Sequence, residues 1–210
     1  MEILDEQLIN PKTSASKNFF DSNSFFIDEK VGFFKFENVY KVYNDNGDQI
    51  GNIKQRIPLG YKLLSLLINK AMLPFKLEIL DNNEVPQASL KRGWTFLMSK
   101  IEVLDSFGNQ IGFIKQKFKL FKPTFQILDA NSNLIATITG DWKAWNFQIA
   151  DAQNNPIGLI NKKWAGAMKE LFTTADKYNV TIDPSYTDEK SKIVIISTAI
   201  TIDMVLKEKK

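Results

Sequence analysis

The sequence predicts a mainly β fold, a closed antiparallel barrel of about twelve strands that encloses a hydrophobic C-terminal α-helix. Two observations predict this fold. A hairpin pattern occurs five times along the chain, and an apolar segment without a polar face follows the last copy. Every copy contains an alternating apolar strand, an Asp or Asn, a short polar turn and a second strand. The equivalent Asp and Asn residues are Asn44, Asp81, Asp105, Asp129 and Asp151.

The composition is that of one soluble globular domain without the usual catalytic side chains. Of the 210 residues, 44% are hydrophobic and 24% are charged, and the net charge of +3 is too small to indicate a general attraction for nucleic acid. The chain has no Cys and no His, which are the side chains most used for nucleophilic and acid–base chemistry near neutral pH. The motifs of a serine nucleophile, a phosphate loop or a dinucleotide site are absent as well. We therefore expect a protein that is not an enzyme.

The chain divides into a short leader and one domain. Residues 1–22 are polar, with Pro11 and several Ser, Thr and Lys residues close together, and they predict a flexible leader. Residues 23–210 are expected to form a single barrel domain. The N-terminal sequence has acids where a signal peptide has bases, so we expect a cytoplasmic protein that is at most peripheral to a membrane.

The strands follow one another in chain order. A first strand is expected near Phe25, and the five copies supply ten more because their turns contain the Asn, Asp, Gly or Pro residues that reverse a chain tightly. A last short strand near Val180 brings the total to twelve. The Leu-rich residues 61–72 predict a short helix, and Trp164–Lys177 predict a second one. The helix at 61–72 either lies on a membrane or packs on its own barrel.

Small residues occupy one position of the second strand in every copy. They are Gly51, Ala88, Gly112, Ala136 and Gly158. An aliphatic residue follows two positions later, and residues two apart share a face of a strand, so we expect both to point inward. Small side chains there would let the strand approach a central helix closely. The alternative is that they mark β-bulges that curve the sheet.

The C-terminal segment Ile193–Leu206 is apolar nearly all round, which predicts a helix buried on every side. As a helix it spans ~21 Å, too short to cross a bilayer but long enough to cross a barrel. Ile193, Ile196 and Ile200 belong to this central helix. Its only charge, Asp203, either reaches the barrel mouth or meets a polar partner inside, because burying an unpaired carboxylate is costly.

The last third of the chain carries the most specific pattern. It consists of Lys163-Trp164, Gly166, Glu170, Phe172-Thr173, Ala175-Asp176, Val180, Lys190, Lys192, Ile200 and Ile202-Asp203. With this pattern the chain resembles, from about Phe25 onward, the phospholipid scramblase family and the LURP-one-related proteins. Their shared Tubby-like fold is a twelve-stranded barrel around a hydrophobic C-terminal helix. The resemblance implies phospholipid binding or transbilayer lipid movement without covalent chemistry.

The family's proposed calcium site corresponds to residues 174–185. The resemblance implies Asp176 as a candidate ligand, and Asp183 is a second candidate that lies close by but shifted from the family's register. Thr174, however, stands where the family has an acid, and Lys177 adds a positive charge. Calcium takes about six to eight oxygen ligands, several of them anionic, so we expect no cofactor. Asp176 alternatively caps or solvates a helix end. Without Cys, the chain also cannot carry an acyl anchor on a thiol.

Lysines alternate along Phe113–Phe121. Lys115, Lys117 and Lys119 share one face of the predicted strand, and Lys122 extends the basic run. They either bind the headgroups of an anionic phospholipid membrane or keep an exposed strand soluble. The Trp residues likewise form an interfacial belt or pack in the core. These residues are Trp94, Trp142, Trp145 and Trp164.

Two hypotheses follow for the function. The first is a scramblase-like protein that associates with an anionic phospholipid surface. No segment is long and apolar enough to span a bilayer, so either the C-terminal helix leaves the barrel or the domain acts without crossing the membrane. The alternative is a soluble, non-enzymatic binding module that presents its basic strands to a protein or nucleic-acid partner. Binding to anionic vesicles distinguishes the two.

Overall fold

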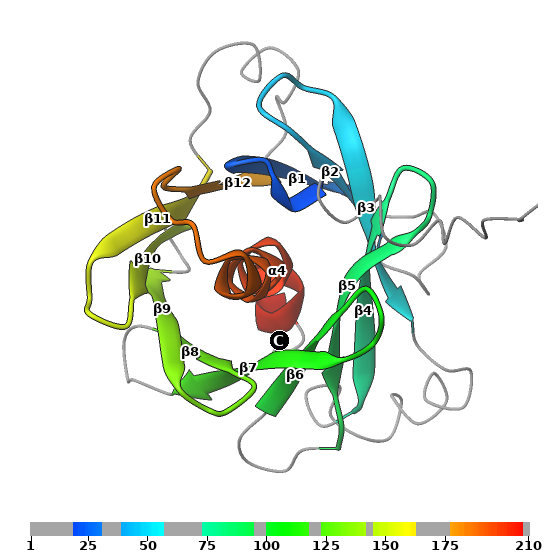
Figure 1. The fold of residues 1–210 in the computed structure, drawn as a ribbon. Helices are drawn as coiled ribbons and strands as arrows, with labels where there is room; N and C mark the ends of the chain where they lie inside the picture. Colours follow the sequence, from blue (N-terminus) through cyan, green and yellow to red (C-terminus); the bar gives the residue numbers. More distant parts are fainter. Residues whose placement is uncertain are drawn as a thin grey trace, which may run out of the picture.

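The computed structural model describes residues 19–30, 39–56, 73–94, 100–117, 123–141, 145–162 and 177–207; for residues 29, 30, 56 and 203–207 it describes the backbone alone. Its strands are β1 (Ser24–Lys30), β2 (Val39–Tyr43), β3 (Gln49–Arg56), β4 (Phe75–Asp81), β5 (Pro86–Arg92), β6 (Lys100–Asp105), β7 (Gln110–Lys117), β8 (Thr124–Asp129), β9 (Leu134–Asp141), β10 (Asn146–Asp151), β11 (Pro156–Asn161) and β12 (Lys177–Ile182). Each strand pairs antiparallel with its neighbours in sequence, and β1 also pairs with β12, so the sheet closes into a barrel. Helix α4 (Glu189–Lys207) passes through the middle (Figure 1).

The predicted fold is confirmed, with small changes at the element boundaries. The five copies of the pattern form β2–β3, β4–β5, β6–β7, β8–β9 and β10–β11. The central helix begins at Glu189 rather than at Ile193, because its first turn is already closed there: the N–H of Lys192 donates to the carbonyl oxygen of Asp188 at 2.8 Å, and the Ser191 hydroxyl donates to Asp188 Oδ2 at 2.5 Å. The helix predicted at 61–72 lies outside the described residues, as does the second predicted helix up to residue 176. Lys177, the expected last residue of that second helix, is instead the first residue of β12.

The five hairpin turns share one set of hydrogen bonds. In each turn the side-chain oxygen of the Asp or Asn accepts a hydrogen bond from the backbone N–H four residues later. The residue three positions after it adopts a positive φ of 62° to 87°. These residues are Gly47, Glu84, Gly108, Ser132 and Asn154. The turn is therefore held by the side chain of its first residue, even where no glycine supplies the left-handed position.

The small residues of the pattern point inward and also adjoin bulges, so both interpretations are correct. In every hairpin the register shifts just before the small residue, which leaves one residue without a partner across the strand pair. The unpaired residues are Ile50, Gln87, Ile111, Ile135 and Ile157. The inward direction is clear at Gly112, where a Cβ atom would lie 2.6 Å from the carbonyl oxygen of Leu128 and 2.8 Å from Cγ1 of Val194 in α4. A side chain there would collide with both the wall and the helix.

Helix α4 fills the barrel. All nine side chains from Val194 to Ile202 are buried, including Ile196 and Ile200, while Ile193 is partly buried nearer the barrel mouth. The helix contacts β5, β7, β8, β9 and β12. Two of its buried hydroxyls bond within the helix: Thr198 donates to the carbonyl oxygen of Val194 at 2.7 Å and Thr201 to that of Ser197 at 2.6 Å. The Tyr178 hydroxyl of β12 donates to the carbonyl oxygen of Ile200 at 2.5 Å, whereas the buried Ser197 hydroxyl has no hydrogen-bond partner among the described residues. No helix in the described part of the chain is long and apolar enough to cross a membrane.

The packed structure begins before residue 23, the predicted start of the domain. Phe19 and Phe20, which the sequence assigned to a flexible leader, are helical and only 2% and 5% exposed. The Phe19 ring lies 5.0 Å from that of Phe20 and 5.9 Å from that of Phe25. Two aromatic residues within a polar stretch bury enough apolar surface to join the core. The average polarity of residues 1–22 does not reveal this contribution.

Candidate functional site

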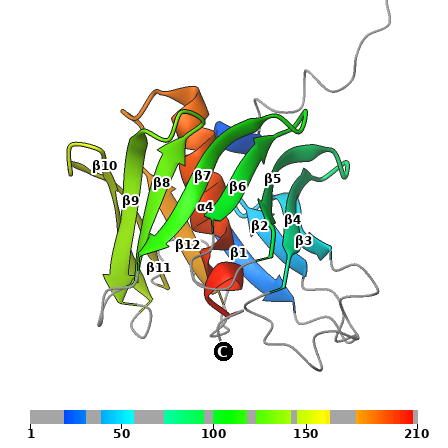
Figure 2. The same cartoon turned by 90° about the horizontal axis from the view of Figure 1, so that it is seen from below.

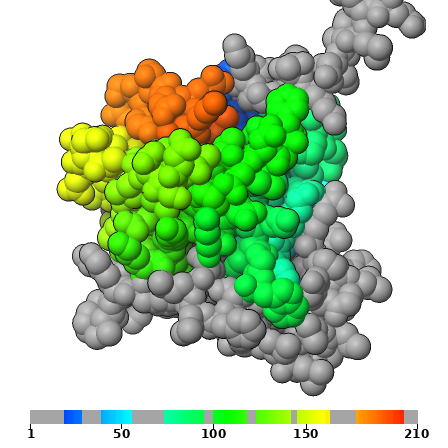
Figure 3. All heavy atoms as spheres, turned by 60° about the horizontal axis from the view of Figure 1, so that its bottom comes forward, coloured from blue at the N-terminus to red at the C-terminus, as the bar shows by residue number. Residues whose placement is uncertain are grey.

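Three lysines project from the outer face of two adjoining strands; we call them the lysine strip. Lys115 and Lys117 on β7 are exposed, whereas Ile114 and Gln116, which alternate with them, are buried. The predicted alternation is thus correct for the described part of the strand, while Lys119 and Lys122 lie outside it. Lys100 on β6, which the sequence reading missed, is exposed and stands directly opposite Lys115. Figure 3 shows this side of the molecule, where β6 to β9 form the green part of the surface.

The arrangement of the lysine strip favours an anionic partner. Like charges directly opposite each other across a strand pair repel by roughly 0.2–1 kcal/mol, as Lys100 and Lys115 do here. An anion between them would relieve that repulsion. The ammonium of Lys100 also lies 3.4 Å from the centroid of the Phe113 ring, which holds the charge near the wall. Lys91 on β5, also exposed, faces Glu102 rather than a cation.

The tryptophans do not behave as one group. Trp94, just beyond the end of β5, is 49% exposed. Trp145 instead packs in the wall, with its ring 5.2 Å from that of Tyr178 and 6.0 Å from that of Phe147, and the Lys162 ammonium lies 4.7 Å from its centroid. Trp142 and Trp164 lie outside the described residues. Core packing therefore explains Trp145, and of the two described tryptophans only Trp94 offers an indole at the surface.

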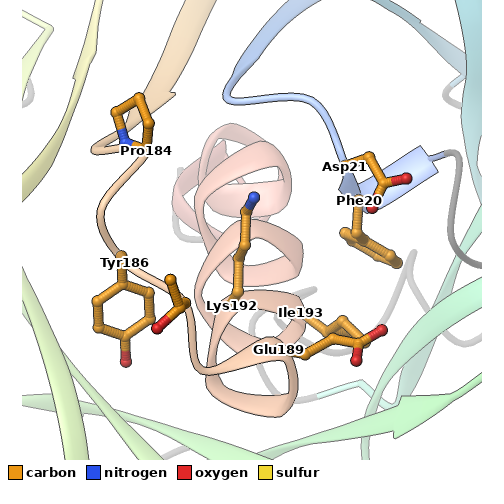
Figure 4. A pocket seen from close by; sticks show the side chains of 8 residues that line it. Phe20, Asp21, Pro184, Tyr186, Glu189, Lys192 and Ile193 are labelled. Carbon is orange, nitrogen blue, oxygen red and sulfur yellow. The ribbon is translucent and has the colours of Figure 1, made fainter.

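A pocket of about 500 Å³ lies at the mouth of the barrel where α4 begins (Figure 4). Lys192 rises from α4 between the N-terminal segment, which contributes Phe20 and Asp21, and the β12–α4 connection. Its ammonium donates to the side-chain oxygen of Asn23 at 3.1 Å, and Glu189 also lines the pocket. Charges of both signs thus surround the space, so the pocket selects neither an anion nor a cation.

Tyr186, on the β12–α4 connection, lines the same pocket. Burial raises the pKa of its hydroxyl, the nearby carboxylates of Asp188 and Asp151 raise it further, and a hydrogen bond with Ser191 opposes them. A phenol with a raised pKa stays protonated at neutral pH and can donate a hydrogen bond, but it is a poor base or nucleophile. The pocket therefore offers hydrogen bonds and apolar contact rather than an activated group.

Asp183, one of the two candidate calcium ligands, holds a turn between β12 and α4. Its Oδ1 accepts the backbone N–H of Ser185 at 2.8 Å, and hydrogen bonds with Ser185 lower the pKa of its carboxyl group. Among the described residues no three acidic side chains are grouped so that they could hold a metal ion. Asp176 lies outside the described residues. Asp203 lies on α4, but its side chain is not among those described.

The architecture defines the class of protein. A closed barrel of twelve antiparallel strands around a hydrophobic C-terminal helix is the Tubby-like fold. A solved X-ray structure of a protein from Arabidopsis thaliana is similar to this chain, with a TM-score of 0.52 over 88% of this chain and 93% of that one, at 10% sequence identity. The model of the Scramblase family matches residues 28–209. The chain belongs to the scramblase family, as its C-terminal pattern predicted.

Proposed function

We propose that this scramblase-family protein binds anionic phospholipid surfaces through the lysine strip and carries out no covalent chemistry. The observation that carries the proposal is the register of β6 and β7, which places Lys100, Lys115 and Lys117 on one outward face. Family membership supports a lipid as the partner. An indole at Trp94 beside β6 adds a side chain that favours the headgroup zone.

The expected strength follows from the charges. A lysine near an anionic bilayer contributes about 1 kcal/mol, so two lysines are worth a factor of about 30 in affinity and three a factor of about 150. This attraction is screened by salt over a Debye length of roughly 8 Å at physiological ionic strength. Binding through the lysine strip should therefore weaken steeply as salt is added.

The test is sedimentation of the full chain with vesicles. Lys115→Gln/Lys117→Gln should weaken binding to vesicles that contain phosphatidylserine about 30-fold, with little effect on vesicles of phosphatidylcholine alone. The matched control is Lys190→Gln/Lys192→Gln, which removes the same charge from the first turn of α4, at the mouth of the barrel that holds the pocket. Equal losses in the two variants would show that net charge alone governs binding. Unchanged binding in the Lys115→Gln/Lys117→Gln variant would remove the lipid role of the lysine strip.

Lipid movement between leaflets is a separate question, and we propose that the domain acts from the surface. The apolar residues that could enter a bilayer, Val194 to Ile202, are all buried inside the barrel. Fluorescent-lipid exchange in proteoliposomes, with and without calcium, measures movement directly. We expect binding without faster exchange. Exchange above that of protein-free vesicles would contradict this part of the proposal.

A further inference from the structure

We infer that the barrel docks end-on, with the end opposite its five hairpin turns facing the membrane. This inference rests on the proposed function and adds the orientation. The turns all lie at one end of the barrel, because β2, β4, β6, β8 and β10 run toward it and their partners return from it. Figure 2 shows the β6–β7 turn at one end and the C-terminus of α4 beyond the other.

The turn end is acidic. The residues from 44–48, 81–85, 105–109, 129–133 and 151–155 include no Lys or Arg. Their acids are Asp45, Asp48, Asp81, Glu84, Asp105, Asp129 and Asp151. The connection from β12 to α4 reaches the same mouth and adds Asp183, Asp188 and Glu189, against Lys190 and Lys192. An anionic surface would repel this end.

The opposite end is basic on its outer face. Its lysines are Lys76, Lys91, Lys100, Lys115, Lys117 and Lys162. Among the described residues at this end, the acids are Glu78, which accepts a hydrogen bond from Lys76 at 2.8 Å, Glu102, Asp141 at the end of β9, and Asp28 and Glu29 near the end of β1. Asp28 is offset by Lys41, which lies opposite it on β2, and by Lys177 at 3.4 Å. Hairpin β6–β7 shows the polarity within one unit: it begins at Lys100, turns at Asp105 and ends at Lys117.

The two ends are far enough apart to act separately. An eight-residue strand such as β7 is about 26 Å long, and a strand tilt of roughly 40° leaves about 20 Å along the barrel axis. That height exceeds two Debye lengths at physiological ionic strength, about 8 Å each. A membrane that touches the basic end is therefore largely screened from the acidic turns, whereas a side-on barrel would bring both signs of charge to the surface.

Trp94 points to the same end independently of charge. Arg92, the last residue of β5, pairs with Ile101 near the start of β6. The next two residues of the chain, Gly93 and Trp94, therefore follow the end of β5 on the side of Lys100. Its exposed indole is suited to the interface between headgroups and acyl chains. The end of the barrel that attracts anionic lipid thus also presents the aromatic side chain that such an interface prefers.

The test uses single cysteines, which are unambiguous because the chain has none of its own. Gly93→Cys lies next to Trp94, and a Cβ atom there meets nothing within 4 Å. Ala130→Cys and Ala152→Cys lie on the exposed β8–β9 and β10–β11 turns, and Gln148→Cys lies on the exposed side of β10. Each variant carries an environment-sensitive fluorophore and is mixed with vesicles of phosphatidylserine and phosphatidylcholine. Sedimentation of the same samples reports binding.

End-on docking predicts a blue shift of the label and protection from an aqueous quencher at position 93, with no change at 130, 148 or 152. The unlabelled thiols give a second readout, since reaction of Gly93→Cys with a maleimide should slow on vesicles while reaction at the turns should not. Sedimentation with equal changes at 93 and 148, or larger changes at 130 and 152, would overturn the orientation and leave the proposed function standing. Absence of sedimentation in every variant and in the unsubstituted chain would overturn both.

Discussion

Gly112→Ala tests the central feature of the structure, a helix that passes so close to the wall that the wall has no room for a side chain. The added Cβ would lie 2.6 Å from the carbonyl oxygen of Leu128 and 2.8 Å from a methyl group of Val194. Both contacts are too short, and one involves backbone that cannot rotate away. Overpacking of this kind costs about 1–3 kcal/mol. Alanine also restricts the unfolded chain more than glycine does, and this stabilises the folded protein by about 0.4–1 kcal/mol. The free energy of unfolding should therefore fall by about 1–2 kcal/mol.

Thermal unfolding followed by circular dichroism measures this loss. For a chain of this length, 1 kcal/mol corresponds to roughly 2–4 °C in Tm, so Gly112→Ala should melt about 2–8 °C below the parent. The matched control is Gly93→Ala, where a Cβ meets nothing within 4 Å and no loss is expected. A Gly112→Ala protein as stable as Gly93→Ala would show that the helix does not approach β7 as described. Combining Gly112→Ala with Val194→Ala should cost less than the sum of the two, since the second change removes both Val194 methyl groups, which would lie 2.8 and 3.0 Å from the added Cβ.

Three further predictions concern other parts of the wall. Tyr178→Phe removes the buried hydroxyl that donates to the Ile200 carbonyl and should lower the free energy of unfolding by about 1 kcal/mol in urea titrations; no change would mean that this bond adds nothing to anchor α4. Phe19→Ala should lower the free energy of unfolding by about 3–5 kcal/mol, because the segment before β1 belongs to the core. A loss below about 1 kcal/mol would show that this segment is a leader outside the core. Hydrogen bonds from Asn133, first its side chain and then its backbone, lower the pKa of the Asp129 carboxyl, so their contribution to stability is present above the unfolded pKa and disappears as pH falls through the lowered folded pKa. Asn133→Ala should move the carboxyl titration of Asp129, followed by NMR, upward toward its ordinary value; an unmoved titration would contradict the turn geometry.

The repeated hairpins were predictable because each carries its own turn chemistry. An Asp at the first position holds the turn through its side chain, and the strand residues alternate inward and outward with a period of two. Asp105 and Asp129 illustrate this, since both accept the N–H four residues later. Local signals of this kind need no knowledge of the rest of the chain. Five of them in series, with an apolar helix at the end, leave few folds other than a closed barrel.

The features that sequence reading missed are those created by distant contacts. Lys100 and Lys115 become neighbours only through the bulge at Ile111, which sets the register of the hairpin. Phe19 becomes a core residue only because Gly51 leaves room for its ring: a Cβ at Gly51 would lie 2.9 Å from it. Helix α4 extends to Glu189 because a polar first turn, closed by the bond from the N–H of Lys192 to the carbonyl oxygen of Asp188, precedes the apolar pattern. The candidate site depends on the first of these contacts, so its lysines could be predicted on one strand but not across two.

The twelve-stranded barrel and its central helix stabilise each other. Eight strands already enclose an interior that side chains can fill, so twelve leave a space that only a further element can occupy. A helix that is apolar on every side, in turn, has no stable place in water. Removal of α4 would therefore expose both surfaces together. This mutual dependence argues that the helix stays inside when the protein meets a membrane.

Locking the helix to the wall tests that argument. In a Gly112→Cys/Val194→Cys variant, the sulfur introduced at position 194 occupies the place of one Val194 Cγ atom. The two Cγ atoms lie 2.8 and 3.0 Å from the Cβ position at residue 112. This separation is within reach of a disulfide bond between the two cysteines. Oxidation ties α4 to β7, and reduction of the same protein releases it, so each sample is its own control. If the domain acts from the surface, oxidised and reduced samples bind phosphatidylserine vesicles equally and give the same low rate of lipid exchange. Binding or exchange that appears only on reduction would show that α4 leaves the barrel to reach the bilayer, because the disulfide is the only difference between the two samples.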